Sequence, residues 1–112
     1  MKDERETIVI FTTIRVERPE GTTVQAGVPV QIESASGDGE HLDFSDARPF
    51  DLFWLYTTHG LPPIPLRRRD VLYDEMNSDP ETNQPAKYRI VADVETFDHD
   101  HQEALCERVV GR

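Results

Sequence analysis

The residues best suited to chemistry lie near the C-terminus, where the chain reads Asp98-His99-Asp100-His101. Imidazole nitrogens and carboxylate oxygens bind divalent transition metals, and both groups can also transfer protons. On a strand, however, the two histidines share one face and the two aspartates point to the other, because successive side chains alternate. A tight turn need not bring them together either. We therefore interpret this segment as a solvated turn between strands and predict no metal and no other cofactor.

The remaining histidines and carboxylates do not form a recognisable catalytic set. His41 and His59 stand alone in loop-like sequence, and no Ser or Cys lies in a context that would activate a nucleophile. Asp70, Asp74 and Glu75 resemble paired carboxylates, but such pairs need a defined cleft that separates their pKa values. We interpret these three residues as solvated strand ends. The sequence thus predicts no catalytic residues and no enzymatic activity.

Composition indicates a single small domain with an acidic surface. The chain has 112 residues, 37% of them hydrophobic and 30% charged, and a formal net charge of -10 at pH 7. This length suits one modest core spanning residues 1–112, and the lean apolar content indicates that part of the chain lies outside the core or depends on a neighbouring subunit. Binding DNA phosphates requires Lys and Arg to displace counterions. The net charge therefore argues against a DNA-binding module.

Cysteine content and hydropathy indicate the cellular compartment in which the protein is expected. Cys106 is the only cysteine, so the chain cannot form an internal disulfide, and we expect this residue to be a buried, small apolar side chain. Residues 1–6 are mostly charged, and no stretch approaches the roughly 20 apolar residues of a membrane span. We expect a soluble protein that assembles in the cytoplasm and has no membrane partner.

The elements that must position these residues read as strands. β-branched residues alternate from Thr7 to Val16, and a second alternating run follows a turn at residues 18–21. The predicted strands comprise residues 7–16, 24–32, 50–57, 71–75, 87–97 and 102–110. The third of these is apolar on both faces, so we expect it to be buried on both. Six short strands without a convincing helix predict an all-β fold, a small six-stranded antiparallel barrel or sandwich.

Two segments between the strands stand out. Residues 34–49 have no regular period, and loops of that length are usually functional. Two glycines allow the segment to move, and apolar side chains farther along can dock it. We assign the following residues to a movable gate: Gly37, Asp38, Gly39, Glu40, His41, Leu42, Asp43 and Phe44. Residues 61–66 contain three prolines, which predict an extended connector that is neither helix nor strand.

Two further groups are candidates for contact with a subunit or partner. Arg67, Arg68 and Arg69 form a basic run in a strongly acidic chain, without the interleaved aromatic residues of a nucleic-acid site. We assign this run to salt bridges with another subunit or a partner; the alternatives are a merely solvated segment and contact with the DNA backbone. Phe53 and Trp54 are assigned to a subunit interface, with core packing as the alternative.

The order and spacing of these runs resemble the head-to-tail stopper, or head-completion, proteins of long-tailed bacteriophages and related gene-transfer particles. The resemblance covers most of the chain through TIVIFTT, GVPVQIE, a long loop, FWLYT, RRDVLYD and KYRIV, in that order. It implies a structural protein of the virion, located at the junction between head and tail.

The resemblance also implies partners. Stopper proteins form a ring, here expected to hold six or twelve copies, between the portal or adaptor ring on the head side and the tail terminator or tail tube on the tail side. Their long loop after the second strand projects into the channel and retains packaged DNA by steric closure. Applied to this chain, that loop is residues 34–49, whose acidic residues would concentrate negative charge around the channel.

Two alternatives remain open. A head-tail adaptor or a tail terminator of the same connector has comparable size and charge, although an adaptor is expected to be more helical. The alternative from another class is a small metal-dependent enzyme that uses His99 and His101.

Overall fold

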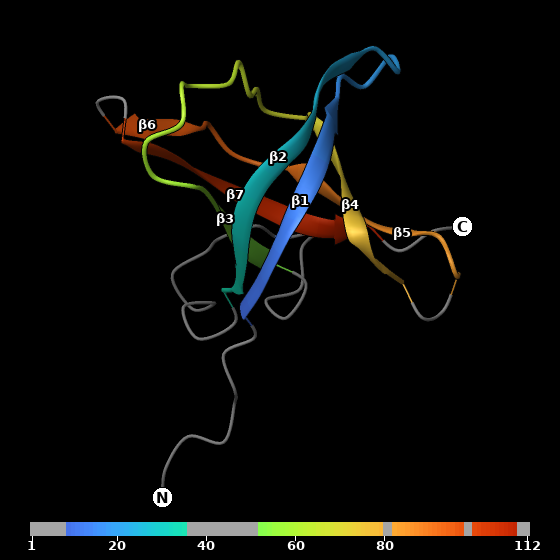
Figure 1. The fold of residues 1–112 in the computed structure, drawn as a ribbon. Coiled ribbons are helices and arrows are strands. Elements are labelled where there is room, and N and C mark those ends of the chain that lie inside the picture. Colours follow the sequence, from blue (N-terminus) through green and yellow to red (C-terminus); the bar gives the residue numbers. More distant parts are fainter. Residues whose placement is uncertain (1–8, 36–51, 80–81, 98–99, 110–112) are drawn as a thin grey trace, which may run out of the picture.

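The computed structural model describes residues 9–35, 52–79, 82–97 and 100–109. These residues form seven strands and no helix: β1 (Val9–Glu17), β2 (Thr23–Ser34), β3 (Leu52–Thr57), β4 (Val71–Ser78), β5 (Pro85–Ile90), β6 (Glu95–Phe97) and β7 (His101–Val109). Six of them close an antiparallel barrel in the order β3-β2-β1-β4-β5-β7, because β7 also pairs with β3. The predicted small six-stranded barrel is confirmed, with β6 as an additional strand (Figure 1).

The interior of the barrel is filled by alternate residues of its strands. On β1, Ile14 and Val16 point inward and Ile10 packs against the same cluster, as the alternation predicts. The other strands contribute in the same way: Val28, Val30, Ile32, Phe53, Leu55, Leu72, Ala86, Tyr88, Ile90, Ala104 and Cys106. Cys106 is buried, as expected. No helix in the described residues is long and apolar enough to cross a membrane.

Strand β3 is buried on both of its faces. Phe53 is 7% exposed and meets Tyr88 edge to face inside the barrel, with ring centroids 5.5 Å apart. On the outer face, Leu52 packs with Leu105 in a second apolar cluster, against which Trp54 lies half-buried. The predicted burial of both faces is therefore confirmed at Leu52, whereas Trp54 and Tyr56 on the same outer face are only half-buried. Of the two aromatic residues assigned to an interface, Phe53 lies in the core of its own chain, and only Trp54 lies on the outside.

The predicted strand 87–97 is wrong as one continuous element. It is divided into β5, which pairs with residues 106–109 of β7, and β6, which pairs with residues 101–103. Between them, Val91 and Ala92 pack on the outer cluster whereas Val94 packs against the barrel core. In a regular strand, residues two positions apart share one face, so Ala92 and Val94 would pack against the same cluster. They pack against different clusters, and the chain therefore bends between β5 and β6.

The polar segment after β4 is shorter than predicted. Strand β4 continues to Ser78, which pairs with Pro85 at the start of β5. The connection between them is a turn in which the backbone N–H of Asn83 donates to the carbonyl of Asp79 at 2.8 Å. Asn83 has a φ of 61°, a conformation that asparagine tolerates better than most residues.

The proline-rich connector is neither helix nor strand, as predicted, but it also contributes to the core. Ile64 and Leu66 are buried against the barrel interior. The buried side chain of Gln102 accepts a hydrogen bond from the N–H of Ile64 at 2.8 Å and donates to its carbonyl at 2.9 Å. Prolines have no N–H of their own to attach the segment to the sheet. Gln102 therefore holds the connector across the barrel end drawn at the top of Figure 1.

Replacing Gln102 by Ala should lower the free energy of unfolding by about 2–4 kcal/mol, because the buried N–H and carbonyl of Ile64 would lose their partners. Chemical denaturation of the full chain measures this change. The matched control is Gln25→Ala at an exposed position of β2, which should alter stability by less than about 0.5 kcal/mol. Equal effects of the two substitutions would show that Gln102 does not hold the connector.

Candidate functional site

The first candidate site is the end of the barrel from which residues 36–51 extend. The ladder between β2 and β3 runs from Val30 and Thr57 to Ser34 and Phe53, and the N–H of Ala35 then donates to the carbonyl of Leu52 at 2.9 Å. Ser34 and Ala35, which were predicted to belong to the loop at residues 34–49, therefore belong to the paired hairpin. The gate residues assigned from Gly37 to Phe44 lie outside the described residues, so their assignment stays a prediction.

The arginine run lies at the opposite end of the barrel. Arg67, Arg68 and Arg69 are exposed on a turn that precedes β4, close to the β1–β2 turn. Among the described residues, the only carboxylate paired with the run is that of Asp93, whose Oδ1 lies 4.0 Å from Nη1 of Arg68. Both of these side chains are well exposed, so the pair adds little stability. The run is therefore available to a partner, as its assignment requires.

A buried carboxylate fixes the arginine turn. Asp70 is 0% exposed, and its Oδ2 accepts hydrogen bonds from Nη1 of Arg18 at 2.6 Å and from the N–H of Arg67 at 2.8 Å. The interpretation of Asp70 as a solvated strand end is wrong. A charged partner that lies 52 positions away in the chain, together with a backbone donor, allows the carboxylate to be buried.

Asp74 is also buried, so its interpretation as a solvated residue is wrong as well. Its Oδ1 accepts a hydrogen bond from the hydroxyl of Thr12 at 2.5 Å, which joins β1 to β4. The same oxygen accepts from the N–H of Asn77 at 3.0 Å, within β4. Glu75 is exposed, as predicted, and accepts from the N–H of Gly27. These two carboxylates have structural partners and do not face a common cleft.

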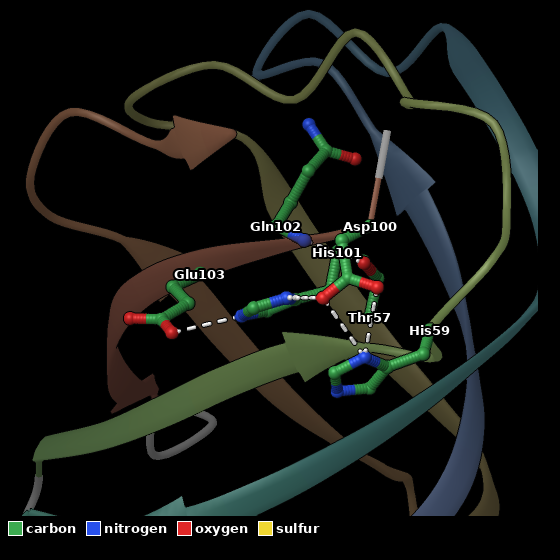
Figure 2. Close-up of polar contacts among 6 residues, drawn as sticks. All are labelled: Thr57, His59, Asp100, His101, Gln102 and Glu103. Atoms are coloured by element: carbon green, nitrogen blue, oxygen red, sulfur yellow. Dashed lines mark hydrogen bonds and ion pairs between the residues drawn. The ribbon is translucent and has the colours of Figure 1, made fainter. Parts of the chain in front are cut away.

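The second candidate site is a group of polar residues near the β6–β7 turn. His59, from the turn after β3, lies beside Asp100 and His101 at the start of β7 (Figure 2). Nδ1 of His59 lies 3.0 Å from Oδ2 of Asp100, and Nδ1 of His101 lies 3.1 Å from the same oxygen. Nε2 of His101 lies 2.9 Å from Oε2 of Glu103. The group is therefore continuous from His59 to Glu103.

Backbone and ring contacts hold this group together. The N–H of Gly60 donates to the carbonyl of Asp100 at 2.8 Å, which links the two turns directly. The φ of Gly60 is 86°, a conformation that L side chains rarely adopt. The ring of His101 stacks with those of His59 and Phe97, at centroid distances of 4.7 and 4.9 Å. Hence the position of His101 is determined on several sides.

The same contacts shift two pKa values. Hydrogen bonds to Glu103 and Asp100 raise the pKa of His101 above its ordinary value of 6.5. Hydrogen bonds from His101 and His59 lower the pKa of Asp100 below its ordinary value of 3.8. Both shifts favour the charged forms of His101 and Asp100.

A groove of about 570 Å³ runs beside this group over the outer face of β1, β2 and β3. It is lined by both histidines, Glu103, Tyr56 and Phe11, whose side chain is 72% exposed. No cysteine nucleophile faces it, because Cys106 is buried in the barrel and burial raises the pKa of its thiol. The arrangement offers imidazole and carboxylate groups that can bind a cation or transfer protons.

Sequence reasoning found only half of this second group. His59 was judged isolated, and the turn at residues 98–101 was considered by itself; His99 lies outside the described residues. His59 and Asp100 are 41 positions apart, and no local spacing connects them. The signal available in the sequence is only that the segment after the predicted strand 50–57 and the turn after the predicted strand 87–97 each carry a histidine.

Comparison with known proteins adds no further assignment. No family model, curated protein sequence or solved structure matches this chain. The resemblance to stopper proteins therefore rests on the order and spacing of the strands.

Asp70→Asn should lower the free energy of unfolding by about 3 kcal/mol, because the charge of Arg18 would lose its buried partner. The measurement is equilibrium denaturation. Asp93→Asn, which removes the exposed partner of Arg68, is the matched control and should have an effect below about 0.5 kcal/mol. An Asp70 variant as stable as the control would contradict the structural role of this carboxylate.

The pKa of His101 should lie above 6.5 in an NMR titration performed in the presence of a chelator, and Glu103→Gln should lower it. The matched control is Glu95→Gln, on the residue that faces Glu103 across the β6–β7 ladder.

Because the folded pKa is raised, the contribution of His101 to stability is complete below pH 6.5 and disappears as the pH rises through the folded pKa. The contribution of Asp100 is present above pH 3.8 and disappears as the pH falls through its lowered pKa. A His101 that titrates at or below 6.5 would rule out the proposed cause.

Proposed function

We propose that this chain is a structural subunit of a ring at the head-tail junction of a tailed virus or gene-transfer particle. In this role it retains packaged DNA and provides a docking surface for the tail. The observation that carries the proposal is the anchored hairpin of β2 and β3, from which residues 36–51 extend. The same position in the strand order bears the channel loop in the proteins that this chain resembles.

The hairpin is a suitable base for a gate. Its ladder stays paired up to Ser34 and Phe53, and one further backbone bond joins Ala35 to Leu52. Residues 36–51 therefore leave and rejoin the barrel at neighbouring backbone positions. A segment anchored in this way can change conformation without breaking the hydrogen bonds of the barrel.

The charge of this segment supports a channel role. It carries Asp38, Glu40, Asp43 and Asp46, and a ring would multiply this charge around its opening. Negative charge in a confined passage repels DNA phosphates over a screening distance of about 8 Å at physiological ionic strength. The passage would thus be closed by steric obstruction without binding DNA strongly.

The two ends of the barrel differ, as a connector between two other rings requires. One end bears residues 36–51, and the opposite end presents the exposed arginines at 67–69 on the turn that Asp70 holds. In a chain with a net charge of -10, an exposed basic turn is suited to an acidic surface of a neighbouring ring. We assign the arginine end to this contact.

The fold favours a stopper over an adaptor. The described residues contain seven strands and no helix, whereas an adaptor is expected to be rich in helices. Barrel closure gives every wall strand a paired neighbour on both sides, so we expect ring assembly to rely mainly on side-chain contacts. Trp54, which lies half-buried on the outer face, is suited to such a contact.

Deleting residues Gly37–Phe44 should yield particles that attach tails but lose their genomes, because the obstruction would be removed while the barrel stays intact. The measurements are the DNA content of purified particles and tail attachment by electron microscopy. Circular dichroism of the purified variant should retain the β signal of the parent chain.

A variant of unchanged length separates steric closure from charge. Replacing Asp38, Glu40 and Asp43 by their amides should preserve genome retention, because the obstruction remains. If particles with the deletion keep full genomes and normal infectivity, residues 37–44 are not the gate.

A further inference from the structure

We propose that His59, Asp100 and His101 form a binding site for a divalent first-row transition metal ion, of which Zn²⁺ is the best match. This inference is independent of the proposed ring function. It differs from the expectation drawn from the sequence, which considered the turn at residues 98–101 without His59. The structure adds this third residue from a distant part of the chain.

The three side chains converge on one point. One potential ligand atom from each residue lies within 4.8 Å of the other two. Around a tetrahedral Zn²⁺ with bonds near 2.1 Å, ligand atoms are separated by roughly 3.3 Å. The two histidine nitrogens already lie 3.0 and 3.1 Å from Oδ2 of Asp100. These two nitrogen–oxygen separations are close to those around a tetrahedral ion, and the three side chains come together at one place (Figure 2).

The hydrogen-bond pattern leaves a place for a cation. Nε2 of His101 donates to Oε2 of Glu103 at 2.9 Å when this nitrogen carries the ring proton. In a neutral ring, Nδ1 then presents a lone pair toward Asp100, and a carboxylate oxygen only accepts. Two acceptors 3.1 Å apart repel each other, so this contact is satisfied either by a second ring proton or by a metal ion that displaces that proton. A metal ion satisfies both acceptors and the nitrogen of His59 at once.

Glu103 completes an arrangement that is common around metal ions. Histidine ligands usually donate their second ring N–H to a carboxylate or carbonyl, which fixes the tautomer and the ring orientation. Glu103 occupies this position relative to His101 and is a positioning residue, not a ligand. The stacking of Phe97 on His101 and the bond from Gly60 to Asp100 limit motion further.

The ligand set selects the kind of ion. Two imidazoles favour zinc, copper or nickel, whereas calcium and magnesium prefer sets composed of oxygen atoms. Three protein ligands leave a fourth tetrahedral position for water or a group from another molecule. The side chains of His59 and Asp100 are 73% and 53% exposed, so an ion can reach the site from solvent.

Isothermal titration of the full-length, chelator-treated chain with ZnCl₂ tests the proposal. One equivalent should bind, and added Zn²⁺ should raise the melting temperature because it binds the folded state. His59→Gln and Asp100→Asn should each weaken Zn²⁺ binding by at least about tenfold. Substitutions of residues that only surround the ligands already weaken metal binding by about this factor. Both side chains are exposed, so these variants should fold, which circular dichroism verifies.

Two matched controls are available in the same chain. Glu20→Gln removes an exposed carboxylate of the turn between β1 and β2, and Asp93→Asn removes an exposed carboxylate on a different segment. Both should bind Zn²⁺ as the parent chain does. Glu103→Gln should weaken binding by about tenfold without changing the stoichiometry. If the parent chain binds Zn²⁺ no more tightly than the His59 and Asp100 variants, or does not bind it, the proposal is wrong.

Discussion

The pairing of β7 with β3 is the interaction on which the rest of this structure depends. Without it, the strands would form an open sheet with β3 at one edge. Because β7 also pairs with β5 and β6 on its other side, it is the one strand in contact with three others. Its residue Gln102 additionally holds the proline-rich connector, so closure of the barrel and the covering of one end depend on the same strand.

Closure of the barrel assigns different roles to its wall and its ends. The wall consists of six strands, each paired with a neighbour on both sides. The features available for function lie at the ends: the base of residues 36–51 at one, and the arginine turn and the histidine group toward the other. In the proposed ring, one end would face the channel and the arginine end a neighbouring ring. Function would then depend on the strands only through the positions that they give to these turns.

The sequence was sufficient to predict most of the strands but not the contacts between turns. Alternating β-branched residues identified β1 and β2, because a period of two is a local property. The burial of Asp70 and Asp74 depends on Arg18 and Thr12, which lie 52 and 62 positions away. No local pattern reports such partners, and the same holds for His59. The break between β5 and β6 arises because the chain must supply two different core clusters, which its alternation alone does not reveal.

The central claim, that this chain forms a ring at a head-tail junction, is tested most directly by electron cryomicroscopy of particles from cells that produce it. The account predicts a closed ring of six or twelve copies of this barrel between portal and tail, with residues 36–51 directed into the channel and residues 67–69 against a neighbouring ring. Particles whose head-tail junction contains no density that fits the barrel would contradict it.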